Sequence, residues 1–233
     1  ATDTDSADSG GLTYSLITND ASGTVFALSG TSLTMTAQDY ENPACGGSSD
    51  SLSCTVVVRV ADAASQSPSD LTITVSVTDQ NDQTPAVSVS ATYNHAEAAS
   101  TTWQTFTITD SDTSGTYSCT LGGTDAADFS ATISGKVCTV AWAANPDYET
   151  PADNGGNNVY DITIAFSDGT NDLAAQTTAV TVTDANDQTP SYSAGDTTPS
   201  VAEGQTAVDS FTVTDTDTGD SNSCTLAGAD ASD

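Results

Sequence analysis

Residues 79–85 read Asp-Gln-Asn-Asp-Gln-Thr-Pro, and residues 184–190 read Asp-Ala-Asn-Asp-Gln-Thr-Pro, 105 positions later. Each copy follows a run that ends in Val-Thr and places two carboxylates and an amide ahead of a proline. The repetition predicts a tandem array whose unit of about 105 residues has the size of one β-sandwich domain.

The apolar residues in this chain alternate with polar ones, as they do in β-strands. Leu71, Ile73, Val75 and Val77 alternate with threonine and serine. The same pattern recurs at residues 106–108, 160–166, 180–182 and 211–213. No segment carries a sustained apolar stripe with the period of a helix. Short strands separated by Gly, Asp, Asn and Ser predict an all-β protein of consecutive sandwiches.

A second matching pair of segments defines the repeats. Residues 106–119 (FTITDSDTSGTYSC) match residues 211–224 (FTVTDTDTGDSNSC) at the same offset. We therefore predict a first repeat at 1–85 that lacks its first strands, a complete repeat at 86–190, and the opening strands of a third at 191–233. We interpret the chain as part of a longer array. The alternative is a head-to-tail filament, in which residues 191–212 of a neighbouring copy complete the first repeat by strand addition.

The charge of the chain is strongly unbalanced. Thirty-two Asp and Glu residues face only two strong bases, Arg59 and Lys136, which gives a formal net charge of −30. Such a polyanion repels nucleic acid and anionic lipid, and it attracts cations. No apolar run approaches the roughly 18 residues of a membrane span, so we expect none within this segment.

Two cysteines of the second repeat behave as a pair. Cys119 and Cys138 are expected on neighbouring strands, and their counterparts in the first repeat, Tyr14 and Leu33, are both non-cysteine. Residues that are replaced together are expected to be bonded to each other.

The remaining cysteines are Cys45, Cys54 and Cys224. Cys45 and Cys54 flank a Gly/Ser-rich stretch and can close a short loop by a disulfide. Two disulfides predict an oxidising, extracellular compartment. The sequence assigns no partner to Cys224.

Carboxylate and amide oxygens recur in sets along each repeat, and these are the ligands that Ca²⁺ prefers. The single histidine and the committed cysteines disfavour zinc and other soft-ligand sites. The pair Asp147 and Glu149 comes with no signature of a catalytic cleft, so we expect no enzymatic activity. Trp103 and Trp142 are expected at a surface or an interface, where they leave open the alternative of a carbohydrate-binding module.

Acidic motifs follow one another in a fixed order along the repeats. The second repeat carries an early Glu97, then Asp110-Ser-Asp112, Asp147-Tyr-Glu149, Asp168 in a late turn, and the segment 184–190. This order resembles that of the cadherin repeat. Parts of the same series recur in the other two repeats, so the resemblance covers the whole chain. It implies tandem Greek-key immunoglobulin-like β-sandwiches in a linear array, with Ca²⁺ ions at the seam between consecutive repeats.

Carried over by position, the resemblance implies two sets of calcium ligands. The first cluster comprises Asp39, Glu41, Asp79, Asn81, Asp82, Asp110, Asp112 and Asp168. The second cluster comprises Glu97, Asp147, Glu149, Asp184, Asn186, Asp187, Asp215 and Asp217. Gln83 and Gln188 replace a second asparagine of the family pattern, at a position whose backbone oxygen is the expected ligand.

The function expected from these features is that of an extracellular structural or adhesive array that Ca²⁺ makes rigid. Its expected partners are neighbouring repeats or copies of itself. Other cell-surface proteins and glycans are further candidates.

Overall fold

The computed structural model describes residues 11–18, 24–45, 52–62, 68–193 and 195–231. Within these ranges the regular structure is almost entirely strand, and the one helical element is a three-residue 3₁₀ turn, η1 (Ala126–Asp128). None of the described helical structure is long and apolar enough to cross a membrane. The predicted all-β class is confirmed.

Residue contacts divide the chain into two units. The first unit contains the chain up to Pro85 together with residues 110–116 and 168–171. The second contains residues 86–109, 117–167 and 172–233. The loops 110–116 and 168–171 therefore belong by contact to the first unit, although they lie in the second repeat by sequence.

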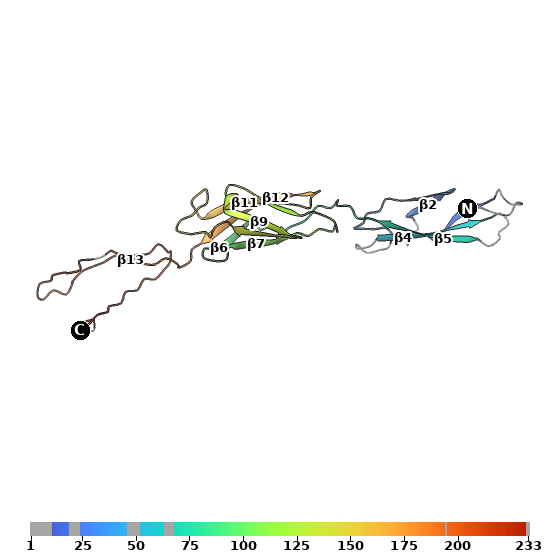
Figure 1. The fold of residues 1–233 in the computed structure, drawn as a ribbon. Coiled ribbons are helices and arrows are strands. Elements are labelled where there is room, and N and C mark those ends of the chain that lie inside the picture. The colour runs from blue at the N-terminus through green and yellow to red at the C-terminus, as the bar shows by residue number, and fades with distance from the viewer. Residues whose placement is uncertain (1–10, 19–23, 46–51, 63–67, 194, 232–233) are drawn as a thin grey trace. The chain divides into compact units, whose positions relative to one another are not determined.

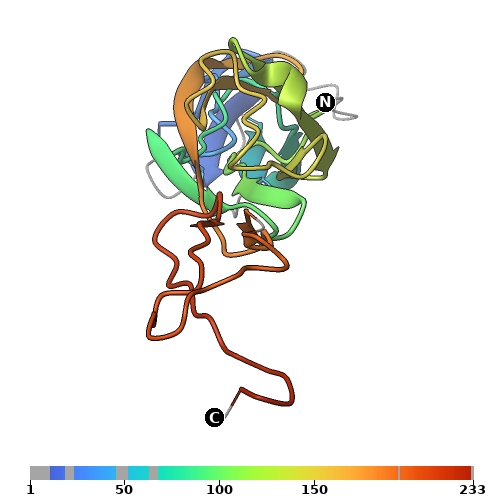
Figure 2. The same cartoon turned by 90° about the vertical axis from the view of Figure 1, so that its left-hand side faces the viewer.

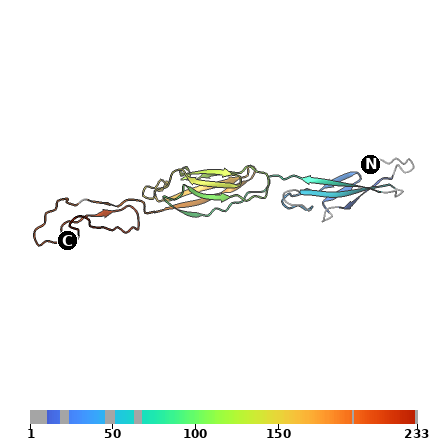
Figure 3. The same ribbon diagram turned by 60° about the horizontal axis from the view of Figure 1, so that its bottom comes forward.

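The second unit holds a seven-stranded sandwich made of two facing sheets (Figures 1 and 3). One sheet has the order β6 (Thr92–Ala96), β12 (Asp172–Thr183), β11 (Val159–Ser167) and β8 (Ser118–Gly122). The other has the order β7 (Thr102–Thr107), β10 (Val137–Trp142) and β9 (Phe129–Ser134). The chain changes sheet between β6 and β7, β7 and β8, β8 and β9, and β10 and β11, which is a Greek-key arrangement. β6 and β12 pair in parallel, from Thr92 opposite Ala179 to Ala96 opposite Thr183.

The core of this sandwich is unusually aromatic. Phe129 and Trp142 lie with ring centroids 4.2 Å apart, and Trp103 packs against Phe129 at 5.6 Å. Trp103 is 8% exposed and Trp142 is 4% exposed, so the expectation that they lie at a surface is wrong. Both fall on the inward face of a strand, where a large ring gains more by burial than by contact with water.

The first unit has a three-stranded sheet and a separate hairpin. The sheet has the order β1 (Thr13–Thr18), β4 (Leu52–Ala61) and β5 (Ser69–Val77), and β2 (Phe26–Ser29) pairs with β3 (Ser32–Met35). Ile73, Val75 and Val77 of β5 pack against the core as their alternation predicts. Leu71, near the start of β5, is 59% exposed and lies outside that cluster of described residues.

Both expected disulfides are present. Cys119 on β8 is joined to Cys138 on β10, so this bond crosses from one sheet of the sandwich to the other. The expectation that the two cysteines lie on neighbouring strands is wrong, because β8 pairs with β11 and β10 pairs with β7 and β9. The bond ties together two layers that are otherwise joined by packing and connecting loops.

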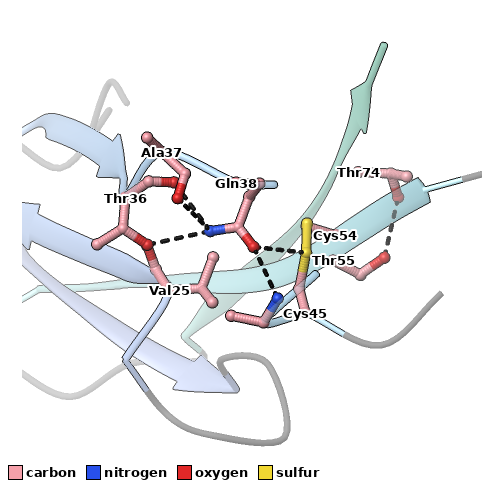
Figure 4. Close-up of a disulfide and its surroundings, with 9 residues drawn as sticks. Val25, Thr36, Ala37, Gln38, Cys45, Cys54, Thr55 and Thr74 are labelled. Carbon is pink, nitrogen blue, oxygen red and sulfur yellow. Dashed lines mark hydrogen bonds between the residues drawn. A yellow bond between two sulfur atoms is a disulfide. The ribbon is translucent and has the colours of Figure 1, made fainter. Parts of the chain in front are cut away.

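The second disulfide joins Cys45 to Cys54 of β4 (Figure 4). Just before Cys45, the side chain of Gln38 bridges the two ends of segment 36–44. Its Nε2 donates to the carbonyl oxygen of Thr36 at 2.9 Å, and its Oε1 accepts from the backbone N–H of Ala44 at 3.2 Å. Segment 36–44 is thus closed by hydrogen bonds, and the disulfide attaches the neighbouring Cys45 to β4.

The described residues beyond 190 contain little regular structure, and Figure 2 shows them mostly as irregular chain. Two strands of two residues each, β13 (Ser191–Tyr192) and β14 (Val213–Thr214), pair with each other. Phe211 is 56% exposed and lies outside a strand, contrary to the pattern at residues 211–213. Cys224 is exposed and free.

Candidate metal centres

The first cluster lies within the first unit and is organised by the segment that follows β5. One carboxylate oxygen of Asp79, Oδ2, accepts hydrogen bonds from the hydroxyl and the backbone N–H of Thr113, the latter at 2.7 Å. The backbone N–H of Gln83 donates to Asp112 Oδ2 at 2.8 Å. Asn81 Nδ2 donates to the carbonyl oxygen of Asp168 at 3.2 Å. Segment 79–85 therefore contacts both loops that complete the unit.

These contacts gather carboxylates into two groups that share Asp112. Glu41, Asp82 and Asp112 each present an oxygen within 4.8 Å of the others, and so do Asp110, Asp112 and Asp168. Asp112 and Asp168 are buried, at 1% and 0% exposure. Both groups offer only oxygen ligands.

Asp39 lies beside Glu41 and caps the turn that carries it. Its Oδ1 accepts the backbone N–H groups of Glu41 and Asn42, each at 3.1 Å, and it belongs to neither group. Aspartate commonly caps its own turn in this way. This turn places Glu41 in the cluster. In the second cluster Asp147 caps a turn in a similar way, because its Oδ1 accepts the backbone N–H of Thr150 at 2.9 Å.

The second cluster lies within the second unit and repeats the hydrogen bonds of the first. Asp184 Oδ2 accepts from the hydroxyl and the N–H of Thr218, and the N–H of Gln188 donates to Asp217 Oδ2 at 2.9 Å. Three groups of carboxylates have oxygens within 4.8 Å of one another. They are Glu97 with Asp147 and Glu149, Glu149 with Asp187 and Asp217, and Asp215 with Asp217 and Asp220.

Glu97 connects this cluster to the sandwich. It is 2% exposed, and its Oε1 accepts the N–H of Ala185 at 2.8 Å. Its Oε2 accepts the N–H of Tyr148 at 2.5 Å. One buried carboxylate thereby holds the exit segment after β12 against the loop that carries Asp147 and Glu149.

Eleven of the sixteen predicted ligands fall within the five carboxylate groups. The other five are Asp39, Asp79, Asn81, Asp184 and Asn186, which contact the surrounding loops by hydrogen bonds. The role of all sixteen as metal ligands stays a prediction.

Two residues of the clusters were not predicted. Asn171 Nδ2 donates to the carbonyl oxygen of Gln83 at 2.9 Å and to Asp168 Oδ2 at 3.1 Å. Asp220 joins a carboxylate group, although its counterpart in the second repeat is Gly115. The repeat pattern could not indicate Asp220, because the two repeats differ at that position.

The electrostatics of the clusters oppose full ionisation. Burial raises the pKa of Glu41 to about 7, with nearby Asp79 and Asp112 adding to the effect. Burial likewise raises the pKa of Glu149 and that of Asp217. The hydroxyl of Thr113 lowers the pKa of Asp79. Burial also acts to raise the pKa of Asp168, but the N–H groups of Asn171 and Thr170 outweigh it and lower that pKa. Hydrogen-bond donors therefore outweigh burial at Asp79 and Asp168, whereas burial outweighs the donors at Glu41, Glu149 and Asp217.

Several buried carboxylate oxygens have no hydrogen-bond partner among the described residues. Such oxygens indicate whether the clusters suit a bound cation. They include Glu41 Oε1, Asp79 Oδ1, both Glu149 oxygens, Asp184 Oδ1 and Asp217 Oδ1. Leaving such oxygens unpaired is costly, and Ca²⁺ accepts six to eight oxygen ligands. Neither strong base fills this role, because Arg59 pairs with Asp70 at 2.7 Å and Lys136 Nζ lies 5.2 Å from the ring centre of Tyr117. The donor set therefore fits a hard divalent cation such as Ca²⁺.

Comparisons with known proteins support the architecture. No family model matches the chain, and no curated protein matches it in sequence. Among solved structures, the protocadherin GammaB4 extracellular domain matches with a TM-score of 0.60 and 22% identity, over 94% of this chain and 34% of that one. Protocadherin gammaB7 EC3-6, described as a cis-dimer, matches with a TM-score of 0.57 and 20% identity, over 90% and 49%. Human CDH23 EC21-23 matches with a TM-score of 0.58 and 20% identity, over 89% and 69%.

The chain spans about half or less of the two protocadherin chains. At these identities the likeness concerns the fold. The chain has the fold of cadherin ectodomains, a Greek-key immunoglobulin-like β-sandwich, as the order of its acidic motifs predicts.

Proposed function

We propose that this chain is part of an extracellular structural or adhesive repeat array whose consecutive repeats are held in a fixed orientation by Ca²⁺. The observation that carries the proposal is the set of buried carboxylate oxygens without partners, which occurs at equivalent positions in both clusters. Asp79 and Asp184 are one such pair, 105 residues apart.

The residues that would hold the ion are those of the carboxylate groups, with Asp79 and Asp184 beside them. Bound Ca²⁺ would supply the positive charge that offsets the repulsion among these carboxylates. The protein's own hydrogen bonds prepare the sites. Thr113 and Gln83 fix one oxygen each of Asp79 and Asp112, so the second oxygen of Asp79 is left for a ligand.

Extracellular calcium-binding modules commonly have dissociation constants of about 10⁻⁴–10⁻³ M, so such sites fill outside a cell and empty inside it. The domain boundaries at residues 85 and 190 and the extracellular location belong to the same proposal. The alternative of a carbohydrate-binding module loses its stacking residues, because Trp103 and Trp142 are buried.

Small-angle X-ray scattering of the chain in Ca²⁺ and after chelation tests the proposal. We expect a defined maximum dimension in Ca²⁺ and a broader distance distribution without it. A matched variant, Glu41→Gln with Glu149→Gln, should resemble the chelated protein in both conditions. An identical distance distribution with and without Ca²⁺ for the unmodified chain would contradict the proposal.

A further inference from the structure

The loop after β14 brings three aspartates together within six residues. Asp215, Asp217 and Asp220 present carboxylate oxygens within 4.8 Å of one another. Gly219 lies between the last two with φ of 86°, a backbone region that favours glycine and allows the chain to turn back sharply. The group is therefore formed by one loop.

The equivalent group in the first cluster is assembled differently. There Asp110 and Asp112 are joined by Asp168, which belongs to a separate turn, and Gly115 occupies the position of Asp220. The asparagine of the preceding segment contacts the third member in both clusters. Asn81 Nδ2 donates to the carbonyl oxygen of Asp168 at 3.2 Å, and Asn186 Nδ2 donates to Asp220 Oδ2 at 2.5 Å. Asn81 thus contacts the backbone of Asp168 and Asn186 the carboxylate of Asp220, and each of these aspartates is the third carboxylate of its group.

Asp217 supplies independent evidence for a ligand at this group. Its side chain is 7% exposed, and its Oδ2 accepts the N–H of Gln188. Its Oδ1 is buried without a hydrogen-bond partner among the described residues. One of its two carboxylate oxygens lies within 4.8 Å of an oxygen of Asp215 and of an oxygen of Asp220. A buried carboxylate beside two other carboxylates is stabilised by a cation, because neither neighbour donates a hydrogen bond when ionised.

We propose that Asp220 binds Ca²⁺ together with Asp215 and Asp217, as a ligand that this loop has and its counterpart in the second repeat lacks. The inference rests on the proposed function, since it adds a ligand to the second cluster. Affinity at such sites depends on the number of charged ligands. Removing Asp220 is therefore expected to weaken this cluster selectively.

The experiment isolates the second cluster within the full chain. A parent variant carrying Glu41→Gln and Asp82→Asn removes two carboxylates of the first cluster. Calcium binding is then measured by isothermal titration calorimetry for the parent and for the parent with Asp220→Asn, Asp220→Gly or Asp230→Asn. Asp220→Gly introduces the residue that the second repeat has at the equivalent position, Gly115. Asp230→Asn removes one negative charge from an exposed aspartate outside the carboxylate groups. Near-ultraviolet circular dichroism checks that each variant keeps its aromatic core.

We expect both substitutions of Asp220 to weaken calcium binding roughly tenfold, which is the loss of one charged ligand, and Asp230→Asn to leave it unchanged. Equal affinity of the parent and both Asp220 variants would overturn the role of Asp220 while leaving the proposed function intact. Absence of calcium binding by the unmodified chain would overturn the proposed function itself.

Discussion

The backbone N–H of Gln83 donates to Asp112 Oδ2 at 2.8 Å, across 29 positions of sequence. The same bond, from Gln188 to Asp217 at 2.9 Å, occurs 105 residues later. Glutamine stands here where the family pattern has asparagine. The side chain of each glutamine donates to the preceding aspartate, at 2.6 Å for Asp82 and 2.7 Å for Asp187. The two clusters therefore have the same hydrogen-bond geometry around these glutamines, although they lie 105 residues apart in the sequence.

Calcium should stabilise the folded chain, and removing one ligand should reduce that effect. Free Ca²⁺ at 100 times its dissociation constant adds about 2.7 kcal/mol per site to the free energy of unfolding. Glu149→Gln should lower the Tm in saturating Ca²⁺ and not in chelator, because burial already disfavours the charge of Glu149. Differential scanning calorimetry measures both conditions.

The control for this experiment is Asp172→Asn, which changes an exposed carboxylate outside the groups. It should leave the calcium-dependent shift in Tm unchanged. A Glu149→Gln variant that keeps the full shift would show that Glu149 is no ligand.

Calcium binding at the first cluster should weaken as the pH falls below about 7, because the pKa of Glu41 is raised to about 7 and only its ionised form binds a cation. The apparent affinity should fall by up to about tenfold per pH unit for the one proton displaced. Calorimetry in buffers of different ionisation enthalpy measures that proton, and Glu41→Gln should abolish its release. A pH-independent affinity between pH 5 and about 7.5 would contradict this prediction.

The raised pKa of Glu41 also affects the stability of the calcium-free protein, which should increase as the pH falls. The folded-state pKa of Glu41 lies above its ordinary value of 4.5, so its protonated form stabilises the fold. That contribution is complete below about pH 4.5 and is lost as the pH rises through about 7. Urea unfolding in chelator at pH 5 and pH 8 measures it, and Glu41→Gln should reduce the difference.

Trp142→Ala should destabilise the second unit by about 3–5 kcal/mol, since it removes a buried ring that packs on Phe129 and Tyr160. Trp142→Phe should cost less, because it keeps an aromatic ring in the core. Chemical unfolding followed by tryptophan fluorescence of Trp103 measures the change. A near-neutral Trp142→Ala variant would mean that this ring does not belong to the core.

Replacing both Cys119 and Cys138 by serine should cost about 2–4 kcal/mol of stability, because the bond constrains the unfolded chain. Cys224→Ser, which changes an exposed free thiol, should have no measurable effect. Thermal unfolding of the three proteins under non-reducing conditions compares them. Equal stability of the double variant and the unmodified chain would contradict a structural role for the bond.

The sequence alone predicts the strand class and most of the acidic groups, because alternation and a fixed repeat are local patterns. Glu41, Asp82 and Asp112 come together as their positions in the repeats suggest. The position of Trp142 and the sheet that carries Cys119 depend instead on which strands face each other across the core. That information is non-local, and no single motif contains it. Asp220 escapes prediction for another reason, since it is a difference between repeats.

The parallel pairing of β6 with β12 has a mechanical consequence. Because the first and last strands of this sandwich run in the same direction, the chain enters at one pole and leaves at the opposite pole. A pulling force between these poles acts along the two strands, so it loads their hydrogen bonds in shear. The bonds from Thr92–Ala179 to Ala96–Thr183 must then fail together, whereas a hairpin pulled from its open end would unzip one bond at a time. The parallel pairing of β6 with β12 would therefore resist such a force through several bonds at once.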